Sequence, residues 1–105
     1  MNKEIIESLK EINKQDFAIK FDNMQQYLSG QGINIIPSGG GKISNCYNCQ
    51  RYKVISNTLL SKRDIEELHF FGLLGYGQEF WQSNPETIED GKYSITTVSR
   101  ADSSD

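Results

Sequence analysis

The chain has 105 residues, a net charge of −3 and a hydrophobic fraction of 36%. These values fit one folded domain with a single core, and they exclude a disordered chain or two lobes around a cleft. The charge is uneven: residues 1–53 hold seven Lys/Arg against five Asp/Glu (+2), whereas residues 54–105 hold four against nine (−5). Because a generic nucleic-acid-binding protein is usually basic overall, that class is less favoured.

The first residues of the chain bear on its location. Met1–Leu9 has acidic residues within its apolar stretch and no small-residue cleavage site, which argues against a signal peptide. No apolar run approaches the roughly 20 residues that span a bilayer. We therefore expect a cytoplasmic protein whose two cysteines are thiols or metal ligands rather than a structural disulfide.

Two helices are predicted first. Asn2 can cap an amphipathic helix over the first dozen residues. Residues 16–29 show both alternating and helical apolar spacing, but the helical spacing persists longer, so a helix capped by Asp16 is favoured. In either conformation we expect Phe17 and Phe21 in the core.

A short strand and a glycine-rich loop follow. Residues 33–36 predict a strand that Pro37 stops, and residues 38–42 predict a mobile loop. A nucleotide-binding loop of the Walker type needs a glycine where Ile36 lies and Ser or Thr where Ile43 lies. The sequence therefore excludes that class of site.

The next candidate site is a Cys-x-x-Cys pair. Cys46 and Cys49 have the spacing that presents two thiolates to one zinc ion. Beyond these cysteines, His69 is the one side chain in the sequence with a nitrogen or sulfur atom of the kind that binds zinc. A carboxylate, a water or a second chain would have to complete the site. A redox pair is a further alternative. A pair without special chemistry is the most favoured interpretation, so no cofactor is expected and zinc is the alternative.

Residues 50–56 are rich in strand formers and carry basic side chains. Together with Lys42, the cations Arg51 and Lys53 could form a basic patch beside Tyr47, and such a patch can bind nucleic acid by neutralisation and stacking. A few cations in an acidic protein more often form a solvated face. Nucleic acid binding is therefore the alternative and not the main prediction.

A third helix begins with a clear local signal. Ser61 can cap it and Asp64, at the third helical position, can complete a capping box. Beyond this helix, residues 78–83 predict a strand, which would place Phe80 and Trp81 on opposite faces and leave one of them exposed.

A hairpin is predicted near the C-terminus. Asp90 and Gly91 supply the positive φ angles of a two-residue type I′ turn between residues 87–89 and 92–99. The assembled prediction is one α+β domain over residues 1–99, with a small, mostly antiparallel sheet packed on two or three helices and a C-terminal β-hairpin. Residues 100–105 are predicted to be a disordered tail. The alternative is a winged helix, whose recognition helix would be acidic and would suit DNA poorly.

The residues show no paired carboxylates, Ser-His-Asp set or metal-hydrolase spacing, so we do not expect an enzyme. The expected function is that of a small acidic protein-binding module that inhibits another macromolecule stoichiometrically, of the phage counter-defence or toxin-immunity type, by occluding a basic surface of a protein target. The alternative is a zinc-binding or nucleic-acid-binding regulatory protein. No membrane association is expected, and the chain is predicted to be a monomer or homodimer. The predicted partner-binding residues are Tyr76, Glu79, Phe80, Trp81, Glu86, Glu89 and Asp90.

Overall fold

The computed structural model describes residues 1–43, 46–75 and 77–100, and for residues 40–43, 46–48 and 78–80 it describes the backbone alone. It confirms the α+β fold class and the C-terminal hairpin. The elements in chain order are α1 (Lys3–Ile12), α2 (Phe17–Gly30), β1 (Ile33–Ile43), β2 (Cys46–Ser56), α3 (Lys62–Phe70), β3 (Gln78–Gln82), β4 (Glu86–Ile88), a 3-10 turn (Glu89–Gly91) and β5 (Lys92–Arg100).

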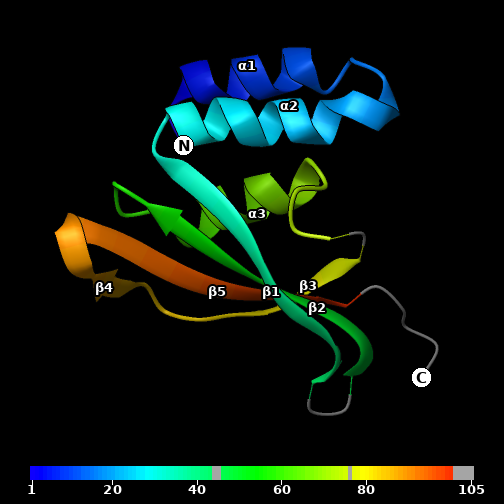
Figure 1. Ribbon diagram of the computed structural model, residues 1–105, viewed down its shortest axis with the longest axis vertical. Helices are drawn as coiled ribbons and strands as arrows, with labels where there is room; N and C mark the ends of the chain where they lie inside the picture. Colours follow the sequence, from blue (N-terminus) through cyan, green and yellow to red (C-terminus); the bar gives the residue numbers. More distant parts are fainter. Residues whose placement is uncertain (44–45, 76, 101–105) are drawn as a thin grey trace.

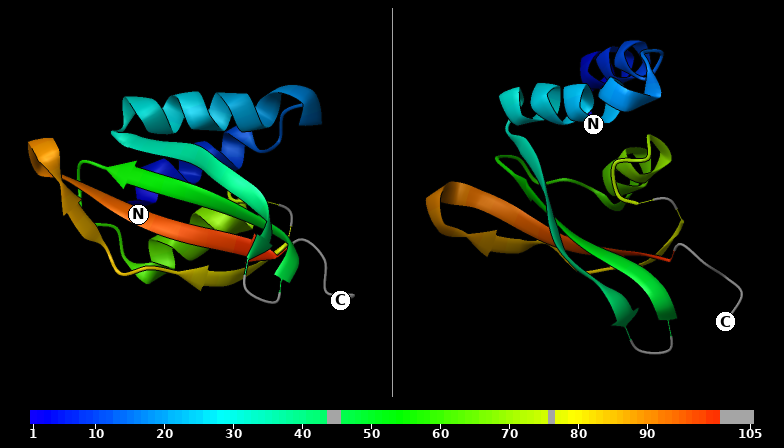
Figure 2. Two further views of the ribbon diagram at one scale, coloured as in Figure 1. Left: turned by 60° about the horizontal axis from the view of Figure 1, so that its bottom comes forward. Right: turned by 45° about the vertical axis from the view of Figure 1, so that its right-hand side comes forward.

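The sheet has five strands, and every pairing in it is antiparallel. The strand order is β1-β2-β5-β3, and β4 pairs with the first half of β5 on the same side as β3. The helices lie on one side of this sheet (Figures 1 and 2). The winged-helix alternative is therefore wrong, since the hairpin belongs to a five-stranded sheet that the helices cover.

One hydrophobic core fills the space between the helices and the sheet. Its side chains come from all three helices and from alternate positions of the central strands. The sheet side that points into this core is called the helix face below, and the opposite side is called the open face. Buried core residues include Leu9, Met24, Leu28, Val54, Leu68 and Ile95.

The helical prediction for α2 is confirmed, but two details of it are wrong. The Asp16 side chain makes no capping hydrogen bond, and Phe17 is 63% exposed. Phe17 lies on the first turn, where its ring packs edge-on against Phe21 at a centroid distance of 5.2 Å. The buried residues of α2 are Met24 and Leu28, on its later turns, so the start of this helix does not reach the core.

Strand β1 is longer than predicted, because it passes through Pro37 and the glycine-rich segment that we expected to be a mobile loop. It lies at the edge of the sheet and pairs only with β2, so the missing N–H of Pro37 can be tolerated. Its register is irregular between Pro37 and Gly40, and Gly39 has a φ of 121°. The glycines therefore bend an edge strand instead of forming a loop.

The hairpin turn has the predicted geometry. Asp90 has φ 63° and ψ 25°, Gly91 has φ 69°, and the Lys92 N–H donates to the Glu89 carbonyl. These are the features of a type I′ turn. Strand β5 extends to Arg100, one residue beyond the predicted end of the domain.

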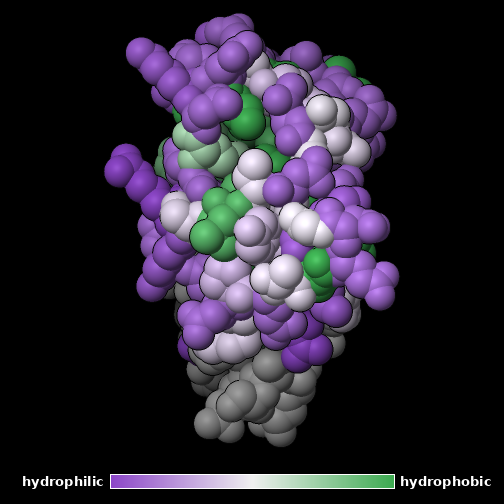
Figure 3. Space-filling view, turned by 90° about the vertical axis from the view of Figure 1, so that its left-hand side faces the viewer, coloured by the Kyte–Doolittle hydropathy of each residue, from purple (hydrophilic) through white to green (hydrophobic). Residues whose placement is uncertain are grey.

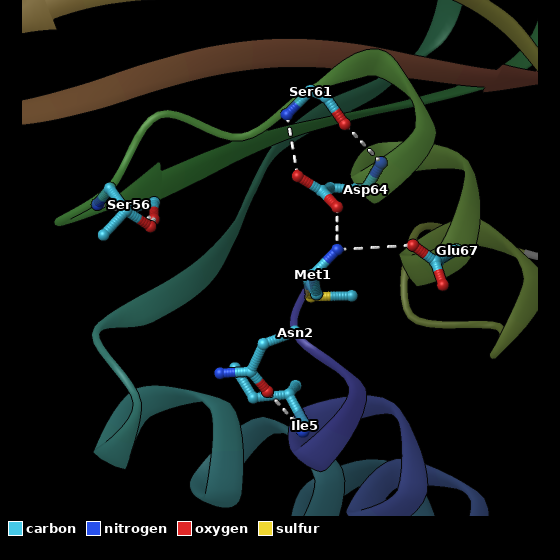
Figure 4. Close-up of polar contacts among 8 residues, drawn as sticks. Met1, Asn2, Ile5, Ser56, Ser61, Asp64 and Glu67 are labelled. Atoms are coloured by element: carbon cyan, nitrogen blue, oxygen red, sulfur yellow. Dashed lines mark hydrogen bonds and ion pairs between the residues drawn. The ribbon is translucent and has the colours of Figure 1, made fainter.

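Both predicted helix caps at α1 and α3 are confirmed. The Asn2 side chain accepts a hydrogen bond of 2.9 Å from the Ile5 N–H. At α3, the Ser61 hydroxyl accepts from the Asp64 N–H at 3.2 Å, and the Asp64 carboxylate accepts from the Ser61 N–H at 2.8 Å. Figure 4 shows that the same carboxylate also contacts the Met1 ammonium, which ties the start of α1 to the start of α3.

Candidate functional site

Of the predicted metal ligands, Cys49 and His69 are not brought together. Cys49 is 1% exposed and forms a disulfide, so the expectation of free thiols is wrong for this residue. The side chain of Cys46 lies outside the described part of the chain. Within that part, no group of three or more His, Cys, Asp and Glu side chains could hold a metal ion. Zinc binding stays a prediction, and it would require the reduced form of Cys49.

His69 lies on the opposite side of the sheet from Cys49. Cys49 pairs with Arg100 in the ladder, and alternation places it on the open face together with Val98. The His69 ring instead lies under the helix face, where Nδ1 is 3.4 Å from the hydroxyl of Ser99. Cys49 and His69 therefore do not come into contact.

The polar cluster around His69 is structural. Nε2 of His69 hydrogen-bonds to the Gly77 carbonyl, so that nitrogen carries the proton. Ser99 is 1% exposed, and its hydroxyl donates to the Leu74 carbonyl. A serine that is buried and donates its proton to a carbonyl is not available as a nucleophile. These bonds fasten the segment after α3 to β5.

Gly75 permits this close approach. Its φ is 97°, and a Cβ at this position would lie 2.8 Å from Oε1 of Gln50 and 3.1 Å from Cβ of Ser99. The Gln50 oxygen in turn accepts a hydrogen bond of 3.1 Å from the Tyr52 hydroxyl. Gly75 is thus closely packed against the side chains of Gln50 and Ser99, and a larger residue at this position would not fit without movement.

The predicted partner-binding residues are only partly described. Tyr76 lies outside the described residues, as do the side chains of Glu79 and Phe80. Trp81 is 52% exposed, as expected for one of two adjacent aromatic residues in a strand.

The other predicted partner-binding residues lie around the hairpin. Glu86, Glu89 and Asp90 are all exposed, on β4 and in the turn after it. Ile88, which the prediction did not include, is 37% exposed beside them. These four residues are called the acidic end below.

The sheet register shows which of these side chains share the open face. Arg51 on β2 pairs with Val98 on β5, and Val98 pairs with Trp81 on β3. These three residues therefore form one row across the sheet, with Trp81 and Arg51 on either side of the buried Val98. Lys53 follows Arg51 on the same face, two residues along β2. Arg51, Lys53 and Trp81 are called the basic end.

Trp81 lies away from the acidic end. Trp81 pairs with Val98, whereas Glu86 pairs with Ser94, four residues away and thus about 13 Å along β5. Figure 3 looks onto the side of the molecule that carries the β4–β5 turn, on the left of Figure 1, and hydrophobic side chains are scattered there among hydrophilic ones. This side of the molecule thus offers a few apolar side chains between hydrophilic ones.

For the nucleic-acid alternative, the structure describes two of four residues. Arg51 and Lys53 are exposed on the open face, whereas the side chains of Lys42 and Tyr47 lie outside the described part. Sequence spacing does not connect Trp81 with these cations, because 30 residues separate Trp81 from Arg51. The alternation of β5 was the signal that could have joined them, since Val98 is the common neighbour in the ladder.

Comparison with known proteins gives no further guidance, since no protein family, curated protein or solved structure matches the chain. Among the residues that the structure describes, no helix is both long enough and apolar enough to cross a membrane.

Proposed function

We propose that this protein is a stoichiometric protein-binding module that inhibits another macromolecule by covering part of its surface, of the phage counter-defence or toxin-immunity type. The observation that carries the proposal is the exposed Trp81 on the open face, together with the three exposed carboxylates of the acidic end. The activity is binding and not catalysis. A cytoplasmic location and the oligomeric state stay predictions.

Trp81 is the strongest anchor on this face. A tryptophan that is 52% exposed leaves a large apolar area in water, and residues of this type carry much of the binding energy at protein interfaces. Ile88, at 37% exposed, adds a second apolar contact near the hairpin turn. Both belong to the same edge of the sheet, on strands β3 and β4, so one partner can contact both.

The acidic end supplies the charge that would select the partner. Glu86, Glu89 and Asp90 make no ion pair with any Lys or Arg in the described ranges 1–43, 46–75 and 77–100. Unpaired carboxylates at an exposed turn steer a basic surface toward the protein and raise the association rate. The expected target is thus a protein with a basic surface.

The partner is expected to contact side chains rather than to extend the sheet. Strand β4 has three residues, and Pro85 precedes it directly, so the outer edge offers only a short, interrupted row of backbone groups. The register is also irregular between Glu79 and Trp81 on β3. Addition of a strand at this edge is therefore disfavoured.

Affinity capture from a host lysate, with and without nuclease, tests the proposal. We expect a protein that is retained after nuclease treatment. Glu89→Lys with Asp90→Lys should slow its association and weaken the salt dependence of that rate, and Trp81→Ala should mainly speed dissociation. The matched control is Glu7→Lys with Glu11→Lys, on exposed positions of α1.

The control makes the same change in net charge far from the proposed surface, so it should leave association almost unchanged. Capture that disappears with nuclease, or an equal effect of both charge reversals, would contradict the proposal.

A further inference from the structure

The proposed function uses Trp81 of the basic end but not its two cations, Arg51 and Lys53. Arg51 and Lys53 point away from the helices on β2, and neither makes an ion pair with an Asp or Glu of the described residues. Arg100 lies on the same face, at the neighbouring row of β5. Among the carboxylates whose side chains the structure describes, the nearest on this face by register is that of Glu86, two strands away from β2 and thus roughly 10 Å across the sheet.

The exposed Trp81 is placed to work with these cations. Its row partner Val98 separates it from Arg51 by two strand spacings, again roughly 10 Å. An aromatic ring on a sheet face offers a stacking surface for a nucleobase, and nearby Arg and Lys side chains can neutralise the phosphates that flank it. The carboxylates of an acidic polypeptide could pair with the cations but supply no ring for Trp81, whereas every nucleotide supplies both a negative charge and a base.

We propose that the basic end binds a short single-stranded nucleic acid, with a base stacked on Trp81 and phosphates neutralised by Arg51 and Lys53. A single strand fits better than a duplex because the bases of a duplex are stacked on each other and cannot reach Trp81. The site is short because the acidic end repels the continuing backbone along the same strands. Since Trp81 also belongs to the proposed protein interface, the oligonucleotide and the protein partner should compete.

Fluorescence anisotropy with a labelled oligothymidylate of roughly 15 nucleotides is the direct test. Trp81 is the one tryptophan of the chain, so its own emission reports stacking and should be quenched as the oligonucleotide binds. With two phosphate contacts on a single strand, log K should fall with log salt at a slope of about −1.4. Titrations between about 50 and 200 mM salt measure this slope.

Two variants separate the parts of the site. Arg51→Glu with Lys53→Glu should lower the affinity at least tenfold and remove most of the salt dependence. Trp81→Ala should lower it by roughly tenfold with little change in slope, and Trp81→Phe should restore part of the loss. The matched control is Lys10→Glu with Lys14→Glu, on exposed positions of α1, and it should retain binding. Circular dichroism and the thermal midpoint check that each variant is folded.

Several results would overturn the inference. These are absence of binding at low salt, equal binding of duplex and single strand, equal loss in the α1 control, or binding without a change in Trp81 emission. Nuclease-resistant capture of an acidic protein that depends on Arg51 and Lys53 would assign the surface to a protein instead. The acidic-end variant Glu89→Lys with Asp90→Lys should keep or tighten oligonucleotide binding, so failure here is distinguishable from failure of the proposed function.

Discussion

Replacement of Asp64 by Asn probes the contact that holds the two ends of the helical layer together. The Asp64 carboxylate accepts from the Ser61 N–H at 2.8 Å and also pairs with the Met1 ammonium, which is 3.4 Å from the Glu67 carboxylate. The side chains of Met1 and Asp64 are 1% and 14% exposed. Asn keeps an oxygen for the Ser61 N–H but loses the charge. Since hydrogen bonds to charged groups contribute about 1.5–3 kcal/mol, Asp64→Asn should cost about 1–3 kcal/mol of unfolding free energy.

The pH dependence gives a sharper signature. Burial raises the pKa of the Asp64 carboxyl, but the hydrogen bonds from Met1 and Ser61 outweigh burial and leave that pKa below its ordinary value. Burial lowers the pKa of the Met1 ammonium, but Asp64 and Glu67 outweigh burial and raise that pKa. The Asp64 contribution is therefore present above the unfolded carboxyl pKa and lost as the pH falls through the folded value. The Met1 contribution is present below the unfolded amino pKa and lost as the pH rises through the folded value.

Urea denaturation of the chain that begins at Met1, from pH 3 to pH 10, measures both effects. The difference between the wild type and Asp64→Asn should be largest between about pH 4 and pH 8 and should shrink on either side. Ser61→Ala is the control for the cap, with a loss of about 1 kcal/mol that does not vary across this window. An unchanged unfolding free energy for Asp64→Asn at pH 6, or a difference that is constant with pH, would refute the assignment of a stabilising ion pair.

Two further pairs of substitutions test the packing. Phe71 is 7% exposed, whereas its neighbour Phe70 is 85% exposed. Urea denaturation should therefore show a loss of unfolding free energy of about 3–5 kcal/mol for Phe71→Ala and of less than about 0.5 kcal/mol for Phe70→Ala. Similar losses for the two variants would mean that the end of α3 is placed incorrectly. Gly75→Ala should cost roughly 2–4 kcal/mol from backbone strain at φ 97° and crowding 3.1 Å from Cβ of Ser99, whereas Gly91→Ala, with φ 69° and open space, should cost only the strain of roughly 1–2 kcal/mol. Equal losses at the two glycines would show that the segment after α3 moves to accommodate the methyl group.

Local signals in the sequence were enough for most of the fold. The Ser61–Asp64 capping box and the Asp90–Gly91 turn depend on residues within four positions of each other, and the structure contains both. The alternation in residues 92–99 likewise predicts a strand, because the side-chain period of a strand is two. These elements suffice to predict an α+β fold with a hairpin.

The failures arose where tertiary context decides. Pro37 ends a strand only if its N–H is needed by a neighbour, and the sequence does not show that β1 lies at the edge. The helical spacing of Phe17 is genuine, but the spacing does not tell that the core ends before the first turn of α2. Likewise, the Cys-x-x-Cys spacing does not show on which face of the sheet each side chain lies. The register places Cys49 on the open face, whereas His69 lies on the helix face.

The candidate site depends mainly on the register of the strands. The register also determines where the positive and negative side chains lie, so the net charge alone does not describe the surface that a partner meets. Along β5, the position that pairs with Arg51 is Val98, and the position that pairs with Ile88 is Lys92, six residues away and thus about 20 Å. The Debye length is about 10 Å at 0.1 M salt, so Arg51 is largely screened from the hairpin turn, whereas Lys53 pairs with Thr96, only two positions along β5 from the partner of Glu86. Arg51 therefore acts on a partner with little influence from the turn. The acidic composition of the chain weakens long-range attraction of a polyanion, but it leaves the short-range contacts of Arg51 and Lys53 intact.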